Sequence, residues 1–281
     1  MSNEKFGVCA VVRMENLYLD EWIRHYLELG FDKIIIYDNN FKGEDNVHDI
    51  TQQYEYDGLV DVIPIPAARE IQVPSYNDCL DRYRDELDWI AFFDIDEFLV
   101  LLKDDTIQEY VDRFPSMCDS ISIPWMVHGD NGHIRYENAP VKERFIFPIY
   151  EFDEGNKMIK SMCRTDNINM RFTKDHPHAL INARYAMYND MTIKVDSHKI
   201  NRDDFNHEYA YLDHYQTKSL EEFINKRRRG YPDMSDEHFD EELNNLNLYF
   251  VINGMTREKY EFIKEYAPEY INSLEPRFKL F

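Results

Sequence analysis

The sequence has few cysteines and no long apolar run. No stretch approaches the roughly 20 apolar residues that span a bilayer, and the polar residues 1–5 lack the character of a secretory signal. The cysteines are spread along the chain with no CxxC pair, at Cys9, Cys79, Cys118 and Cys163. This spacing is typical of free thiols in a reducing compartment. We therefore expect a soluble, cytoplasmic protein without a transmembrane segment.

Positive charge is also scarce. The 281 residues include 54 Asp and Glu but only 32 Lys and Arg, which gives a formal net charge of −22. A field of this sign repels nucleic acid and anionic membranes, so we expect neither as a partner. An anionic substrate would need a local cation, supplied by a bound metal or by a small basic cluster. The hydrophobic content of 43% is ample for a folded core.

The first hundred residues alternate between strand and helix signals, which is typical of a parallel α/β sheet. Apolar, β-branched runs predict four strands, at residues 6–12, 33–37, 59–63 and 89–93. The helical spacing of apolar residues predicts helices between them, at residues 17–29, 45–56 and 76–87. We expect Asn16 to cap the first helix, Gly30 to end it, and Pro74 to stand near the start of the third.

The second half of the chain is less regular. A helix is expected at residues 106–114 and a strand at 120–127. From residue 219 onward the chain is expected to be helical, with helices at 220–229, 236–249 and 256–266. We divide the chain into a domain over 1–230, with halves 1–104 and 105–230, and a helical extension over 231–281 packed on the same unit. The extension is either a homodimer contact or a packed tail.

The strand at 89–93 ends in three carboxylates within four residues, Asp94, Asp96 and Glu97. Crowded carboxylates repel one another and are costly to bury without a partner. Asp94 and Asp96 lie on the same side of an extended chain, since side chains alternate along a strand. Such a pair suits a hard divalent ion, Mg²⁺ or Mn²⁺, which also takes phosphate oxygens. The alternative is a strand end with solvated acids and no metal.

Polar residues also follow the first two strands. In an open parallel sheet, ligands bind at the carboxyl ends of the strands, and Arg13 and Asp38 stand there together with Asp94 and Asp96. A carboxylate such as that of Asp38 can accept the ring N–H of a pyrimidine base. The alternative for Asp38 is an Asx turn with the two asparagines that follow it.

Several segments resemble a known group of enzymes. Residues 11–22 and 29–33 are similar to the opening of family 2-like and family 92 glycosyltransferases, and residues 93–98 are similar to their D-x-D-E-F signature. Further similar positions occur at Trp125, Gly129, Gly132, 157–161, 214–215 and 218–219. The resemblance covers most of residues 6–230.

This resemblance implies a GT-A fold, a Rossmann-like nucleotide-sugar-binding sheet with an irregular acceptor half and a helical C-terminus. It implies transfer of a sugar from a UDP-sugar to a glycan acceptor, with Mn²⁺ or Mg²⁺ bound. By position, Asp96 would be the main metal ligand, and Asp94 would touch the ribose or the metal. Asp38 would face the uracil, and Arg13 would lie beside the base and ribose. His214 would supply another metal ligand or a diphosphate contact, whereas the residues alone favour a core histidine.

Basic residues stand out in so acidic a chain. The cluster at 226–229 is by default a solvated helix end, because cations suit helix C-termini. In a functional role, one or two of its members, or Lys218, would grip the diphosphate. Lys157 and Lys160 are similar candidates on an expected loop. Arg69, before the helix at 76–87, is a candidate for lining the donor pocket.

Inverting transfer requires a carboxylate that deprotonates the acceptor hydroxyl. Asp130, in a glycine-flanked loop, is the first candidate, and Glu97 is the second. Two other functions compete with glycosyl transfer: a nucleotidyltransferase or sugar-nucleotide pyrophosphorylase, and a non-catalytic glycan-binding relative. The former is expected to carry a glycine-rich phosphate loop after the first strand, where residues 13–16 contain no glycine.

Overall fold

The computed structural model describes residues 4–65, 68, 70–149, 154–188, 206–230 and 246–279. Arg69 therefore lies outside the described residues. The four cysteines are buried and free, which confirms the expectation from their spacing. No helix within the described ranges is both long and apolar enough to cross a bilayer.

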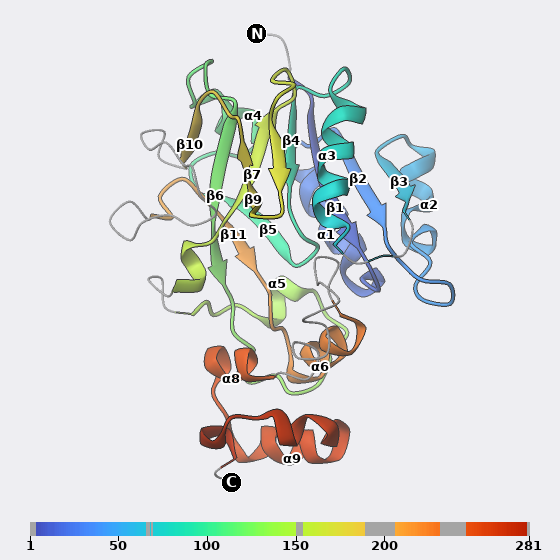
Figure 1. Ribbon diagram of the computed structural model, residues 1–281, viewed down its shortest axis with the longest axis vertical. Helices are drawn as coiled ribbons and strands as arrows, with labels where there is room; N and C mark the ends of the chain where they lie inside the picture. Colours follow the sequence, from blue (N-terminus) through green and yellow to red (C-terminus); the bar gives the residue numbers. More distant parts are fainter. Residues whose placement is uncertain are drawn as a thin grey trace.

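Four parallel strands form the N-terminal part of the sheet, in the order β3-β2-β1-β4 (Figure 1). Their bounds are β1 (Phe6–Val12), β2 (Lys33–Asp38), β3 (Val60–Pro64) and β4 (Trp89–Phe92). Alternate residues of β1 pack into two buried apolar clusters, because successive side chains of a strand point to opposite faces of the sheet. The expected α/β architecture is confirmed.

The connecting helices are α1 (Asn16–Glu28), α2 (His48–Tyr56) and α3 (Gln72–Tyr83). The prediction that Asn16 caps α1 is wrong. Glu15 occupies the cap position and Asn16 is the first helical residue, with its side chain donating to the Asn46 carbonyl. Gly30 follows α1 with a φ of 91°, which confirms the expected stop. α3 begins two residues before Pro74.

The sheet continues beyond β4 with β7 (Ile159–Arg164), β6 (Ser120–Val127), β11 (Ala210–His214) and β5 (Glu97–Leu101). β7 is antiparallel to β4, and β11 is antiparallel to β5. Lys160 therefore lies on a central strand, and the prediction of a loop there is wrong. The remaining strands are β8 (Arg171–Thr173) and β9 (His176–Ile181), which form a hairpin, and β10 (Ala186–Tyr188), which pairs with β6.

Short helices occupy the connections in this half. They are α4 (Ile107–Asp112), α5 (Val141–Arg144) and the 3₁₀ turn η1 (Glu154–Lys157). The helix expected at 106–114 is confirmed in α4, which Thr106 caps by accepting the Glu109 N–H.

The C-terminal part of the chain is helical, at the lower end of the molecule in Figure 1. Its elements are α6 (Leu220–Arg229), α8 (Asn247–Asn253), α9 (Arg257–Tyr266), and the 3₁₀ turns η2 (Pro268–Ser273) and η3 (Pro276–Phe278). One apolar cluster unites Leu220, Phe223 and Ile224 of α6 with the helices that follow residue 246. Packing therefore joins α6 to the C-terminal helices, across the boundary at 230 expected from the sequence.

Candidate functional site

The three carboxylates lie on a tight turn between β4 and β5, which we call the acidic turn (residues 94–97). The buried indole N–H of Trp22 donates to the carbonyls of Asp94 and Glu97, both at 3.0 Å. The N–H of Tyr215 donates to the carbonyl of Asp96 at 2.9 Å. These bonds from α1 and from the end of β11 fix the backbone, so the direction of each carboxylate is set by the fold.

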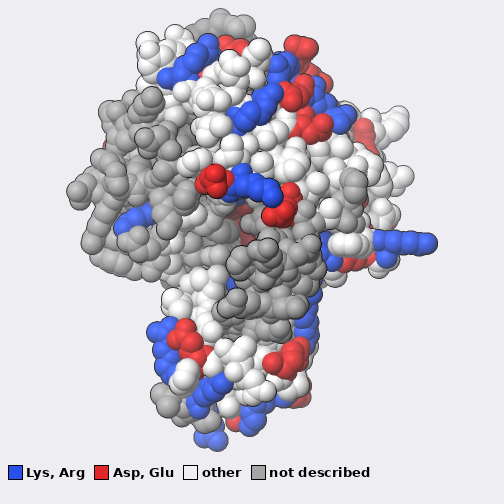
Figure 2. Space-filling model, viewed as in Figure 1, with Lys and Arg blue, Asp and Glu red and all other residues white. Residues whose placement is uncertain are grey.

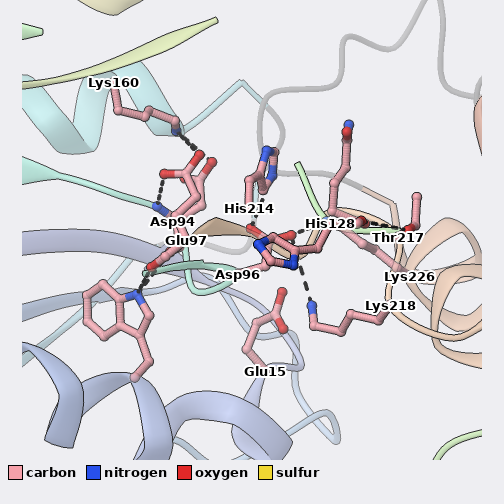
Figure 3. Close-up of polar contacts among 12 residues, drawn as sticks. Glu15, Asp94, Asp96, Glu97, His128, Lys160, His214, Thr217, Lys218 and Lys226 are labelled. Carbon is pink, nitrogen blue, oxygen red and sulfur yellow. Dashed lines mark hydrogen bonds and ion pairs between the residues drawn. The ribbon is translucent and has the colours of Figure 1, made fainter. Parts of the chain in front are cut away.

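A lysine on the neighbouring strand holds Asp94 (Figure 3). The Asp94 carboxylate accepts hydrogen bonds from Lys160 Nζ at 2.6 Å, Gln72 Nε2 at 3.1 Å and the Tyr76 hydroxyl at 3.2 Å. Lys160 is only 1% exposed, whereas Asp94 is 33% exposed. Burial acts to raise the pKa of Asp94, but Lys160 outweighs it and lowers this pKa below its usual range. Asp94 is therefore an anion.

Glu97 is fully buried behind the turn. Its Oε2 accepts the N–H of Asp94 at 2.9 Å, whereas Oε1 has no hydrogen-bond partner among the described residues. Burial raises the pKa of Glu97 well above its usual value, with Lys160 acting in the opposite direction from 3.7 Å. The Glu97 side chain thus stabilises the turn through its hydrogen bond with the Asp94 backbone.

Asp96 faces basic side chains from α6 and from the segment that leads into it (Figure 3). Its Oδ2 lies 2.5 Å from Lys226 Nζ and 4.0 Å from Lys218 Nζ. Its Oδ1 lies 3.8 Å from Nε2 of His214. Burial acts to raise the pKa of Asp96, but the two ammonium groups and His214 hold it far below its usual value. Asp96 is therefore a buried anion.

His214 is the last residue of β11 and packs on Trp125, with ring centroids 4.2 Å apart. Burial lowers the pKa of His214 to about 4, despite the opposing effect of Asp96. The ring is therefore neutral at physiological pH, which is the state that can ligate a metal. Its Nδ1 has no hydrogen-bond partner among the described residues.

Two neighbouring cavities open beside these side chains. The smaller, of ≈ 180 Å³, is lined by Asp94, Asp96, Trp125 and His214 among others. The larger, of ≈ 590 Å³, extends past Tyr18, Tyr136 and Lys218 toward α6. Both are lined by a shared group, Arg13, Glu15, Gln216, Lys226 and Arg229. Positive and negative side chains are interspersed on the face in Figure 2, so the described part of that face carries no extended basic surface for nucleic acid.

Arg13 and Asp38 end neighbouring strands but hold different partners. Arg13 lines both cavities, forms a bidentate ion pair with Glu44, and lies over the Phe41 ring at 4.3 Å. Asp38 Oδ1 accepts the backbone N–H of Asn40 at 3.0 Å and its side-chain amide at 2.6 Å. The Asx turn considered for Asp38 is thus present, and Asp38 lines neither of the two cavities.

Asp130 is tied to the C-terminal helices. Its Oδ2 lies 2.5 Å from Lys259 Nζ and accepts the Tyr249 hydroxyl, while Oδ1 accepts the Gly132 N–H at 2.9 Å. Asp130 and Lys259 are both buried, and Asp130 lines neither of the two cavities. The structure therefore brings Asp94, Asp96, His214, Lys218 and Arg13 to one place, and leaves Asp130 at another contact.

Sequence reasoning missed several residues of the site. Glu15 lines both cavities, and its carboxylate pairs with Arg229, which also donates to the carbonyls of Arg13 and Met14. Trp22 falls within the apolar pattern at 17–29, which indicates burial but not the two carbonyls that accept its indole N–H. The one available signal for Glu15 was its place just after the first strand, beside Arg13.

The side chains around Asp96 can be compared with those that bind a divalent metal. Asp96 and His214 offer one carboxylate and one neutral imidazole, with Oδ1 and Nε2 3.8 Å apart. Among the residues that the structure describes, no group of three His, Cys, Asp or Glu is placed to hold a metal. Mg²⁺ sites commonly use one or two carboxylates and complete their shell with substrate phosphates and water. The pair therefore fits a metal that arrives with phosphate oxygens.

A family model named glycosyltransferase family 92 matches residues 5–247. The chain belongs to this family, as the sequence motifs predict. The match includes the acidic turn, both cavities and α6.

Curated relatives match shorter segments. A family 92 glycosyltransferase of Oryza sativa subsp. japonica is 26% identical over 107 residues, covering 38% of this chain and 18% of the relative. The galactan beta-1,4-galactosyltransferase GALS1 of Arabidopsis thaliana is 35% identical over 72 residues, covering 26% of this chain and 13% of the relative. The matches thus span less than a fifth of the length of these relatives.

The chain is also similar to solved structures at low identity. S. aureus TarS in complex with UDP-GlcNAc is 15% identical, with 96% of this chain and 79% of that chain covered and a TM-score of 0.45. A mannosyltransferase from Pyrobaculum calidifontis in complex with GDP-Man and Mn²⁺ is 12% identical, with 43% and 35% covered and a TM-score of 0.35. Similarity at this level assigns no ligand to this chain.

Proposed function

We propose that this chain transfers a sugar from a UDP-sugar to a hydroxyl of a glycan acceptor with inversion, and that Mn²⁺ or Mg²⁺ binds at the acidic turn. Membership of glycosyltransferase family 92 supports the transfer. The observation that carries the site is that Asp96 and His214 line one cavity. That cavity lies at the carboxyl ends of parallel strands, where open α/β sheets bind ligands.

Each donor contact is assigned to a residue. Asp96 and His214 would hold the metal, and Asp94 would contact the ribose or the metal. Arg13 would lie beside the base and ribose, since it lines both cavities. Asp38 would contact the uracil through Oδ2, because Oδ1 already accepts two hydrogen bonds from Asn40. We also keep Arg69 as a proposed lining residue of the donor pocket.

The leaving nucleoside diphosphate gains negative charge as the glycosidic bond breaks. The metal, when bound, would act as a Lewis acid on that charge. Lys218 and Lys226 line the larger cavity near Asp96, so their ammonium groups are placed to stabilise the same diphosphate. Stabilisation by fixed charges in a buried site is stronger than in water, because the local dielectric constant is lower.

The acceptor hydroxyl must lose a proton, and each proposed base is constrained by its surroundings. Asp130 would have to leave Lys259 and Tyr249. Glu97 would have to ionise within a buried turn, where its pKa is raised by burial. We keep Asp130 as the first candidate and Glu97 as the second.

The test is to incubate the chain with a panel of nucleotide sugars and Mn²⁺, and to follow release of nucleoside diphosphate with and without a chelator. Asp96→Asn should abolish metal-dependent donor binding in a folded protein, because the buried anion is lost. Asp85→Asn makes the same chemical change at an exposed position and should bind the donor normally.

Two results would contradict the proposal. One is that no nucleotide sugar binds or turns over. The other is release of pyrophosphate from a nucleoside triphosphate and a sugar phosphate, which would support the pyrophosphorylase alternative. Normal donor binding by Asp96→Asn would remove Asp96 from the site.

A further inference from the structure

Six charged side chains meet around the acidic turn, three carboxylates and three ammonium groups (Figure 3). They are Asp94, Asp96, Glu97, Lys160, Lys218 and Lys226. The shortest separation from an ammonium nitrogen is 2.6 Å for Asp94, 2.5 Å for Asp96 and 3.7 Å for Glu97. The set is neutral when all three acids are ionised and positive when Glu97 is protonated.

This charge balance determines whether a metal ion or a diphosphate can enter the site without the other. A cluster that is neutral or positive offers a free divalent cation no net attraction, and buried charge without a partner is costly. A metal entering by itself would add two positive charges to the set. A diphosphate entering by itself would place its negative charges beside Asp94 and Asp96. Entry of both together leaves the total charge nearly unchanged.

Lys226 has the most exposed side chain of the three lysines at the acidic turn. Lys160 is 1% exposed on the central strand β7, whereas the Lys226 side chain is 14% exposed on α6 and lines both cavities. Lys218 is farther from Asp96, at 4.0 Å. Besides Asp96, Lys226 also reaches the carbonyl of Gln216 at 3.4 Å. Of the three lysines, Lys226 alone lies within hydrogen-bond distance of an oxygen of Asp96.

We propose that Lys226 is the counter-ion of Asp96 before the donor binds, and that it leaves Asp96 for the diphosphate when metal and nucleotide enter together. The exchange breaks no covalent bond. The inference rests on the proposed function, because it requires a diphosphate donor. Its consequence is cooperative binding: Mn²⁺ and the nucleotide each raise the affinity of the other by the same factor.

The first test titrates the full chain with Mn²⁺ and follows the EPR signal of the free ion, without nucleotide and with saturating UDP. GDP is run in parallel, so that a wrong choice of base is recognised. We expect Mn²⁺ affinity to rise about tenfold or more with the nucleotide, within the usual range of coupling between two sites. Equal affinity with and without nucleotide would overturn the inference. If neither nucleotide binds with Mn²⁺, the proposed function itself fails.

The second test uses variants of α6. Lys226→Met removes the counter-ion, so Mn²⁺ affinity without nucleotide should rise about tenfold and the cooperativity should shrink. Lys226→Arg keeps the charge and should stay near the wild type. Lys264→Met on α9 is the matched control, because it makes the same substitution but breaks an exposed pair with Glu261 at 3.0 Å, and Lys264 lines neither of the two cavities.

Thermal unfolding of each variant establishes that it is folded, and Lys226→Gln replaces Lys226→Met if the latter does not fold. Unchanged Mn²⁺ affinity in a folded variant that lacks the Lys226 ammonium would overturn the inference. An equal rise in affinity in Lys264→Met would do the same, because the effect would then be one of total charge and not of the contact with Asp96.

Discussion

The ammonium of Lys259 lies 2.5 Å from the carboxylate of Asp130, and both side chains are buried. Asp130 follows β6, whereas Lys259 belongs to α9. The Tyr249 hydroxyl of α8 donates to the same carboxylate, and Asn253 Oδ1 accepts the Asp130 N–H at 2.6 Å. One aspartate therefore joins the loop after β6 to two C-terminal helices.

Asp130→Asn should lower the free energy of unfolding by about 3–5 kcal/mol, because removal of one partner leaves a buried charge uncompensated. Urea unfolding measures this loss, and the double variant Asp130→Asn/Lys259→Met should recover part of it. A base role predicts the opposite pattern, in which stability is kept and kcat falls while donor binding is unchanged.

Trp22→Phe should weaken binding of Mn²⁺ with UDP, because the two carbonyls of the acidic turn lose their common donor. The loss of stability should be about 1–3 kcal/mol, as expected for buried carbonyls left without a hydrogen bond. Trp89→Phe is a matched control, since the Trp89 indole is also buried but donates to Glu4 at 3.2 Å, outside the turn. Equal weakening in both variants would show that the turn is not held through Trp22.

Lys160→Met should destabilise the fold by about 3–5 kcal/mol, because it leaves Asp94 and Glu97 without their buried cation. Lys5→Met removes an exposed ion pair with Asp32 and should cost less than about 1 kcal/mol. The two free energies are measured by urea unfolding at pH 7. A loss in Lys160→Met no larger than that in Lys5→Met would mean that the carboxylates are balanced by other charges.

Stability should fall as the pH is lowered from about 6.5 to about 4, in part through His25. Burial, and then Lys142, lower the pKa of His25 to about 4 in the folded state, against about 6.5 for an unfolded histidine. Between these values the unfolded chain binds the additional proton, so the free energy of unfolding rises with pH. Below the folded pKa both states are protonated and the full loss is present.

His25→Gln should therefore give a shallower dependence of unfolding free energy on pH between 6.5 and 4. Urea unfolding at several pH values across this window provides the slope. A slope in His25→Gln as steep as in the wild type would contradict the assignment.

The parallel strands could be predicted from the sequence because each is a continuous apolar run bounded by turn residues, as in 33–37 before Asp38. β5 and β11 could not, because β11 pairs with both β5 and β6, which lie far from it in the chain. The acidic turn was visible because its three carboxylates lie within four residues of the sequence. The lysines that balance it come from β7, from before α6 and from α6, and the sequence does not place them together.

Asp38 shows a second limit of prediction from the sequence. An Asx turn and a base contact require the same residue at the same strand end, and the turn is present in the structure. Asp130 shows a third limit, since its partners Tyr249 and Lys259 lie more than a hundred residues later in the sequence. The local sequence shows a polar residue in a glycine-flanked loop, but the partners of this residue are set by tertiary packing.

α6 presents Phe223 to the C-terminal core and Lys226 to Asp96, so one helix is registered against two surfaces at once. A rotation of α6 by a single residue, about 100° about its axis, would turn Lys226 away from Asp96. The apolar residues of the C-terminal helices therefore fix the rotation of α6 about its axis, and with it the direction of the Lys226 side chain. Substitutions in α8 or α9 that rotate α6 should therefore alter donor affinity, although they lie outside the donor site.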